Sequence, residues 1–293
     1  MTDVGENGRS DEASVLRAAL LQSRLDAYEA DLEEQEGSHE LLRSFVLPPP
    51  ASTIVIEQHP ADYWPKALGP PHEMPGYISD DTGRQVWLAA VALSMWFCTE
   101  TWLDPLSGRA ASSAVELGAG AGLVSIVLAR LGVARVIATD GNLEAVKLAQ
   151  ANAKRNSVAD RVRSLHYQWG EAVEPLLAAA GESDGLCCPL IILSDVLYAI
   201  DDGASETDLE RSVRLLVTHG GCKYIVHAHR ARDDQRLRED AFAERLSDVG
   251  VWHQQTSAVQ AEMGVSIRVL RVHDNLVVEA VGPHSSPLGH GWY

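Results

Sequence analysis

Two acidic residues on either side of a glycine-rich turn form the pattern with the clearest chemistry in this chain. Glu116 lies two positions before the first glycine, and Asp140 ends the next predicted strand, 22 residues after that glycine. A carboxylate at the second position is placed to bind both hydroxyls of a ribose. Glycines let the backbone turn sharply and approach a ligand closely. The turn consists of Gly118, Ala119, Gly120 and Gly122.

The spacing of the glycines distinguishes two classes of cofactor. The dinucleotide fingerprint G-x-G-x-x-G requires a glycine at position 123, where this chain has Leu123. Glu116 would repel a pyrophosphate and attract a cation, and S-adenosylmethionine carries a sulfonium and an α-ammonium group but no phosphate. The pattern therefore favours S-adenosylmethionine over a nicotinamide dinucleotide. The agreement in spacing between the glycines and Asp140 disfavours a turn that binds no ligand.

Alternating strand and helix patterns predict the elements that position this turn. From residue 113 onward they predict a doubly wound α/β fold, a mostly parallel, seven-stranded Rossmann-like sheet with one antiparallel strand. Ligands of such sheets bind beyond the carboxyl ends of the strands. The predicted strands are 114–118, 135–139, 162–168, 189–195, 222–228, 251–258 and 265–273, of which the last two should pair antiparallel.

Other reactive or polar side chains end the later strands. Gln168 and Trp169 follow the third strand, where an amide and an indole could contact an adenine. Ser194 and Asp195 end the fourth strand, and the Tyr198 hydroxyl can reach the same space. The structural alternatives are that Trp169 caps the core and that Asp195 caps the next helix.

The chain before residue 113 is predicted to be less regular. Helical patterns at Asp11–Gln35 and His39–Val46 predict an N-terminal helical extension. Thr53–Gln58 has strand composition, and a Pro-rich loop follows at His59–Pro75. A helix then begins near Trp87, which is predicted to line the cofactor site. The predicted divisions are an extension at 1–50, one domain at 51–280 and a tail at 281–293.

Composition limits the class of partner. The chain has 24 Lys and Arg against 41 Asp and Glu, so its net charge is −17. This charge disfavours nucleic-acid binding and suits a protein partner with a basic surface. The longest apolar run, Trp87–Cys98, is too short to span a membrane. Four cysteines without C-x-x-C spacing and an acidic N-terminus predict a cytoplasmic location, extending to the nucleus, and we expect a monomer.

Histidine and cysteine pairs were weighed as metal ligands. The run His227-Ala228-His229 is expected to place its two imidazoles on opposite faces of a strand, so that they do not share a metal. Cys187 and Cys188 meet the same difficulty in an extended segment. No metal site is therefore predicted.

Five segments in one order resemble a known family. They are Thr53–Gln58, G-x-x-V-W-x-A-A at 83–90, E-L-G-A-G-A-G-L-V-S-I at 116–126, W-G at 169–170 and D-V-L-Y at 195–198. Together they resemble the seven-strand protein-lysine methyltransferases related to calmodulin-, chaperone- and elongation-factor-lysine methyltransferases, over about residues 50–275. Arg230, followed by Phe242, is similar to the family's pattern after the fifth strand. Gln168 departs from the family, in which an acid is common at that position.

The resemblance implies an S-adenosylmethionine-dependent methyltransferase that acts on a side-chain nitrogen of a protein, with lysine the expected acceptor. It implies that the glycine turn, Asp140 and Trp169 hold the cofactor, and that Asp195 and Tyr198 lie beside the transferred methyl group. In this hypothesis Asp195 draws in and aims the acceptor, and Tyr198 is a second anchor. Alternatives are a small-molecule N-methyltransferase and a protein histidine or arginine methyltransferase. Intact Asp140, Asp195 and Tyr198 disfavour a binding module without activity.

Overall fold

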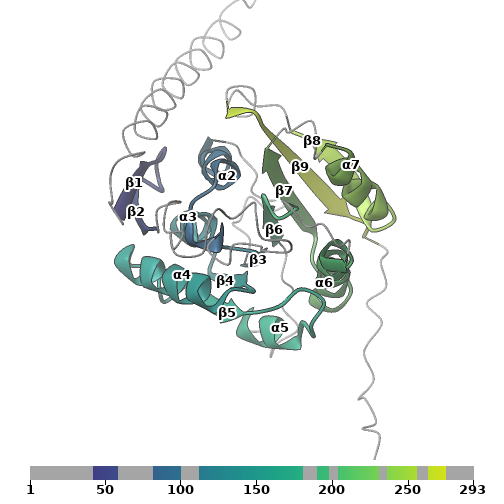
Figure 1. The fold of residues 1–293 in the computed structure, drawn as a ribbon, viewed down its shortest axis with the longest axis horizontal. Coiled ribbons are helices and arrows are strands. Elements are labelled where there is room, and N and C mark those ends of the chain that lie inside the picture. The colour runs from purple at the N-terminus through teal and green to yellow at the C-terminus, as the bar shows by residue number, and fades with distance from the viewer. Residues whose placement is uncertain are drawn as a thin grey trace, which may run out of the picture.

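A seven-stranded sheet forms the centre of the molecule (Figure 1). The computed structural model describes residues 42–58, 82–99, 112–180, 190–197, 204–230, 236–255 and 263–274. Strand order is β5-β4-β3-β6-β7-β9-β8, and only β9 runs against its neighbours. The predicted fold is therefore confirmed. The strands are β3 (Ser113–Leu117), β4 (Arg135–Asp140), β5 (Val162–His166), β6 (Leu190–Ser194), β7 (Tyr224–Arg230), β8 (Gly250–Gln254) and β9 (Val265–Val272).

Helices cover both faces of this sheet, because alternate side chains of its buried strands point to opposite faces. Ala114 of β3 packs in one core cluster, whereas Val115 and Leu117 pack in the other. The first cluster includes α2 (Leu88–Thr99), α3 (Leu123–Arg130) and α4 (Leu143–Arg155). The second includes α5 (Glu174–Ala180), α6 (Ala204–Gly220) and α7 (Arg236–Arg245). None of the helices within the described ranges is long and apolar enough to cross a membrane.

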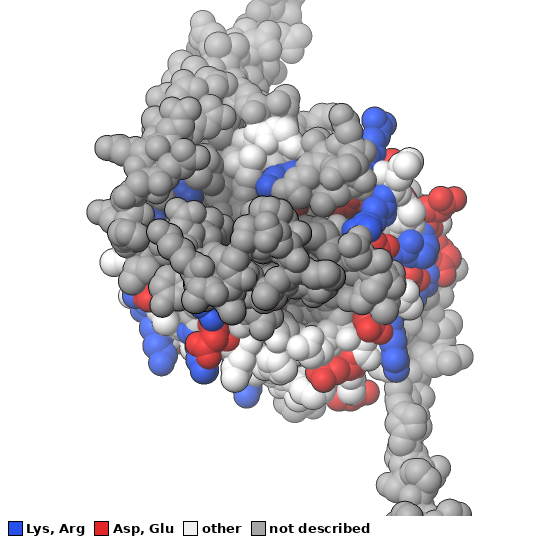
Figure 2. Space-filling view, viewed as in Figure 1, with Lys and Arg blue, Asp and Glu red and all other residues white. Residues whose placement is uncertain are grey.

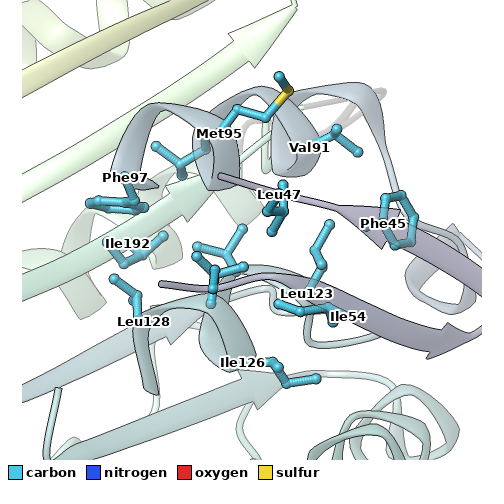
Figure 3. Close-up of a cluster of buried hydrophobic side chains, with 14 of the residues drawn as sticks. Phe45, Leu47, Ile54, Val91, Met95, Phe97, Leu123, Ile126, Leu128 and Ile192 are labelled. Atoms are coloured by element: carbon cyan, nitrogen blue, oxygen red, sulfur yellow. The ribbon is translucent and has the colours of Figure 1, made fainter. Parts of the chain in front are cut away.

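A two-stranded hairpin packs on the first face, beside α3 and α4 (Figure 1). It consists of β1 (Leu42–Val46) and β2 (Thr53–Glu57), which pair antiparallel. The helix predicted for His39–Val46 is therefore wrong from Leu42 onward, because burial alternates along this segment with a period of two. Phe45, Leu47 and Ile54 of the hairpin point into the same core as α2 and α3 (Figure 3). The predicted helix at 11–35, the Pro-rich loop and the tail lie outside the described residues.

Two asparagines, Asn152 of α4 and Asn156 directly after it, fix the hairpin to the main domain. Asn156 accepts a hydrogen bond from the Val55 N–H (2.9 Å) and donates one to the Val55 carbonyl (2.7 Å). Asn152 makes the same pair with Glu57, at 2.7 and 3.0 Å. The side-chain amides thus satisfy the outer backbone groups of β2, which have no strand partner. Gln58, directly after β2, then accepts a hydrogen bond from the Val86 N–H (3.3 Å) and so positions the start of α2.

Candidate active site

The glycine turn lies between the end of β3 and the start of α3, as predicted. Gly118, Gly120 and Gly122 have φ angles of 76°, 52° and 86°, a left-handed conformation that favours glycine. Space requires glycine as well, since a Cβ on Gly120 would lie 2.8 Å from the Gly83 carbonyl oxygen. A Cβ on Gly118 would lie 3.0 Å from Val196. The turn is therefore held in contact with the chain after β6 and with the short 3₁₀ helix η3 (Thr82–Arg84).

Asp140, at the end of β4, faces this turn. One carboxylate oxygen accepts a hydrogen bond from the Gly120 N–H, and the other accepts one from the Asn142 N–H, both at 2.9 Å. Burial raises the pKa of this carboxyl above its ordinary value, and the two backbone hydrogen bonds oppose that shift. Each oxygen can accept a further hydrogen bond. The role of Asp140 in binding a ribose stays a prediction.

Glu116 lies on the α3 side of β3 and is 1% exposed. Its Oε2 atom accepts a hydrogen bond of 2.5 Å from the Ser125 hydroxyl in the first turn of α3. Burial raises the pKa of Glu116 to about 8, and the Asp140 charge adds to that rise while the Ser125 hydrogen bond opposes it. A cation bound at the turn would stabilise the ionised form. In the free protein Glu116 is therefore largely uncharged near pH 7, and its ionisation would be coupled to the binding of a cation.

Gln168 and Trp169, which are predicted to contact an adenine, also lie next to the glycine turn. Gln168 donates a hydrogen bond from its amide to the Gly141 carbonyl (3.0 Å), so it covers the loop after β4. Trp169 packs against the second core cluster, and its ring lies 3.5 Å from the position of a Cβ on Gly118. Trp169 thus closes part of the core and also borders the turn.

Asp195 follows β6 and meets residues from two distant elements. It is 5% exposed, and its Oδ2 atom accepts a hydrogen bond of 2.7 Å from the Arg230 Nε at the end of β7. The Arg230 guanidinium lies 4.8 Å from the centre of the Trp87 ring. The φ angle of Asp195 is 55°, a conformation that costs a non-glycine residue about 1–3 kcal/mol and is concentrated at functional sites. The fold therefore brings Trp87, Asp195 and Arg230 together.

Ser194 and Tyr198 are the two remaining predicted site residues, and the structure describes only the first of them. Ser194 ends β6, directly before Asp195, and its hydroxyl is buried with no hydrogen-bond partner among the described residues. Tyr198 lies outside the described residues, so its predicted role stays a prediction.

The two histidines of β7 correct one expectation. His227 and His229 lie on the same face, because residues two apart on a strand point the same way, and their ring centres are 5.3 Å apart. Both are buried against Glu239 of α7, at 3.2 Å from His227 Nε2 and 3.8 Å from His229 Nδ1. Burial raises the pKa of Glu239 to about 8 and holds that of His227 well below its ordinary value. No group of three or more metal-ligating side chains within the described ranges could hold a metal ion.

Comparison with protein families decides between the cofactor classes. A family model described as lysine methyltransferase matches residues 73–248. The chain belongs to this family. Members of this family use S-adenosylmethionine, which agrees with the left-handed glycines and with the two available acceptor positions on Asp140.

Individual relatives match shorter parts of the chain. Ribosomal protein L11 methyltransferase of Aeromonas hydrophila is 41% identical over 61 residues, which cover 21% of this chain and 20% of that protein. A UPF0665 family protein of Schizosaccharomyces pombe is 23% identical over 190 residues, 62% of this chain and 54% of that protein. The solved human methyltransferase 10 domain containing protein is 12% identical with a TM-score of 0.44, covering 65% of this chain and 85% of that one. The chain thus spans about a fifth of the length of the Aeromonas hydrophila protein and about half of the length of the Schizosaccharomyces pombe protein.

Two further residues of the site were not predicted from the sequence. The glycine pattern alone predicts no role for Ser125, although a hydroxyl in the first turn after the glycines is positioned to reach the acid before them. Arg230 was noted only as part of the family pattern, because its pairing with Asp195 spans 35 residues and depends on the order of β6 and β7 in the sheet. Its position at the carboxyl end of a central strand was the available signal.

Proposed function

We propose that the protein transfers the methyl group of S-adenosylmethionine to a side-chain nitrogen of another protein, with lysine Nζ as the acceptor. The family description supports a lysine acceptor. The observation that carries the proposal is Asp195, a buried carboxylate in a left-handed backbone conformation, held beside Trp87 by Arg230 at the carboxyl edge of the sheet. A buried charge in a strained conformation is not explained by packing alone.

The cofactor roles follow from the contacts around the turn. We assign Gly118, Ala119, Gly120 and Gly122 to the backbone that approaches the donor, and Asp140 to its ribose. Gln168 and Trp169 are assigned to the adenine side, and Glu116 to the cationic methionine end. Trp87 and Ser194 complete the wall between the donor and the acceptor. When bound, S-adenosylmethionine supplies an electrophilic methyl group on a sulfonium.

The acceptor must present a neutral nitrogen lone pair in line with that methyl group. Holding a free lysine neutral at pH 7 costs about 4.6 kcal/mol, since its pKa of about 10.4 lies roughly 3.4 units higher. Positioning the two reactants contributes about 7–11 kcal/mol, so positioning outweighs this cost without a strong base. Asp195 accordingly serves to bind and aim the amine, with Tyr198 as the second anchor.

We further propose a protein partner with a basic surface, which would be attracted by the net charge of −17. On the face shown in Figure 2, the described basic and acidic side chains are interspersed, and no broad area of either sign is visible among them. The attraction is therefore assigned to overall charge rather than to a patch on this face. Action as a monomer in the cytoplasm and nucleus completes the proposal.

The test is to label a protein extract from cells that lack the enzyme. The full chain and S-adenosylmethionine with a tritiated methyl group are added, and the labelled protein is hydrolysed for amino-acid analysis. We expect label in methylated lysine, with Asp195→Asn as a low-activity control. Label in methylhistidine or methylarginine would replace lysine by that acceptor. Label only in small molecules would contradict a protein substrate.

A further inference from the structure

The carboxylate proposed to receive the acceptor already has a cationic partner. Arg230 is 22% exposed and Asp195 5%, and their 2.7 Å contact joins the ends of β6 and β7. The Arg230 guanidinium also lies over the Trp87 ring, 4.8 Å from its centre. Arg230 therefore contacts both the residue assigned to the donor wall and the residue assigned to the acceptor.

This pairing changes the electrostatic effect of Asp195 on an amine. An isolated carboxylate stabilises the ammonium form of a neighbouring lysine, which is the form that cannot accept a methyl group. A carboxylate paired with a guanidinium has little net charge at a distance, yet its second oxygen can still accept a hydrogen bond. The pair can thus aim a neutral amine without favouring its protonation.

We propose that Arg230 is a positioning residue that neutralises Asp195 and thereby selects the unprotonated form of the acceptor amine. This inference rests on the proposed amine acceptor. In this proposal, one fixed side chain of the enzyme makes the site prefer a neutral nucleophile. No residue then has to act as a base.

The other charged groups near this pair do not supply the same neutralisation. Glu239 and His229 both interact electrostatically with Asp195, but His229 is held toward its neutral form by burial. Arg268 of β9 is a second cation in this region, and its guanidinium is bound to Asp240 at 2.6 Å. Among the described residues, Arg230 is the cation for which contact with Asp195 is observed.

The experiment measures how the maximal rate of methyl transfer depends on pH. The full chain, the acceptor protein purified from the labelled extract and saturating S-adenosylmethionine are assayed from pH 6.5 to 10. In Arg230→Met the midpoint of the kcat profile should rise by about 1–2 pH units, because a like charge beside the amine is lost. The rate should fall about 10–100-fold at pH 7 and approach the wild-type rate near pH 10, since the neutral fraction of an amine changes tenfold per pH unit.

Three variants separate this role from a structural one. Arg230→Lys keeps the charge and should keep the midpoint. Asp195→Asn/Arg230→Met removes both charges, so its midpoint should return toward that of the wild type at a lower rate, and it remains informative if the single variant fails to fold. Arg268→Met removes a cation of the same sheet that is paired with Asp240, and it should leave the midpoint unchanged.

Two results would overturn the inference. A loss of rate that is equal at every pH would show that Arg230 only supports the fold. Tighter binding of the acceptor, seen as a lower KM with an unchanged midpoint, would show that Arg230 competes with the acceptor instead. If the wild-type protein labels no lysine at all, the proposed function itself fails, independently of any Arg230 variant.

Discussion

The two halves of the site are built in different ways. The cofactor half, at the ends of β3 and β4, has its buried polar groups paired: Glu116 with Ser125, and Asp140 with two backbone N–H groups. In the acceptor half, at the ends of β6 and β7, the buried Ser194 hydroxyl has no hydrogen-bond partner among the described residues, while His227 and His229 lie 3.2 and 3.8 Å from Glu239. Unpaired buried polar groups are costly. The cofactor half thus pairs both of its carboxyl groups within the chain, whereas the acceptor half leaves one buried hydroxyl unpaired among the described residues.

The two halves also differ in how far their contacts extend along the chain. Glu116 and Ser125 are 9 residues apart, and Asp140 and Gly120 are 20 apart. Asp195 and Arg230 are 35 apart, and Trp87 directly precedes α2, before the sheet. The first half therefore depends on one strand–turn–helix–strand unit, and the second depends on the order of strands in the sheet. Substitutions in the two halves should accordingly have separable effects.

The largest expected effect is in the glycine turn. Gly120→Ala puts a Cβ 2.8 Å from a backbone oxygen at a φ of 52°, so the turn must rearrange. We expect cofactor affinity, measured by calorimetric titration with S-adenosylhomocysteine, to fall by about 100-fold, equivalent to about 2.8 kcal/mol.

Gly264→Ala is the matched control for this substitution. Gly264 has a φ of 58° but no heavy atom within 4 Å of the added Cβ. It should lower the free energy of unfolding by about 1–2 kcal/mol and leave cofactor affinity unchanged. Equal cofactor affinity in Gly120→Ala and in the wild-type protein would remove the turn from the site.

The second effect separates two carboxylates. Asp140→Asn should weaken cofactor binding by about 30-fold, since a hydrogen bond to a charged group contributes about 1.5–3 kcal/mol. Asp195→Asn should leave cofactor affinity within about threefold and lower the rate of methyl transfer by at least about tenfold. Calorimetry and the tritium assay measure the two quantities. If both substitutions weaken cofactor binding equally, the division into two halves is wrong.

The third effect is a pH dependence in the cofactor half. The pKa of Glu116 is about 8 in the free protein, and a bound cation favours the ionised carboxylate. Below pH 8, cofactor binding should therefore release a proton, and affinity should rise by up to about tenfold per pH unit until it levels off near pH 8.

Calorimetry in buffers with different ionisation enthalpies would detect the proton released on cofactor binding. Glu116→Gln should show neither the slope nor the proton release. A slope that persists in that variant would assign the proton to another group.

The smallest effect compares one hydroxyl from each half. Ser125→Ala removes a hydrogen bond to a buried carboxyl and should lower the free energy of unfolding by about 1–3 kcal/mol. Ser194→Ala removes a buried hydroxyl without a partner among the described residues and should not lower that free energy, because no hydrogen bond is lost and an unpaired buried hydroxyl is itself costly. Chemical denaturation of the free protein measures both. Equal losses would mean that the acceptor half is as fully paired as the cofactor half.

The same contrast explains what the sequence could predict. The turn, Asp140 and all seven strands of the sheet follow from local periodicity and spacing, and the structure confirms these elements. The Trp87–Arg230–Asp195 contacts could not be predicted in this way, since they need the spatial order of strands. The strand β1 could not be predicted in this way either, because burial does not follow polarity along it: Arg43 and Phe45 are buried, whereas Leu42 and Val46 are exposed. The expectation that His227 and His229 lie on opposite faces of a strand was wrong, because residues two apart on a strand point to the same face.

The most direct test of the account is a titration of the folded full chain with S-adenosylmethionine, S-adenosylhomocysteine and a nicotinamide dinucleotide. We expect saturable binding of the first two at submillimolar concentrations, weakened about 100-fold by Gly120→Ala, and no binding of the dinucleotide. A folded protein that binds neither adenosyl compound at millimolar concentration, or that binds the dinucleotide instead, would contradict the central claim that a cationic methyl donor occupies the turn beside Glu116 and Asp140.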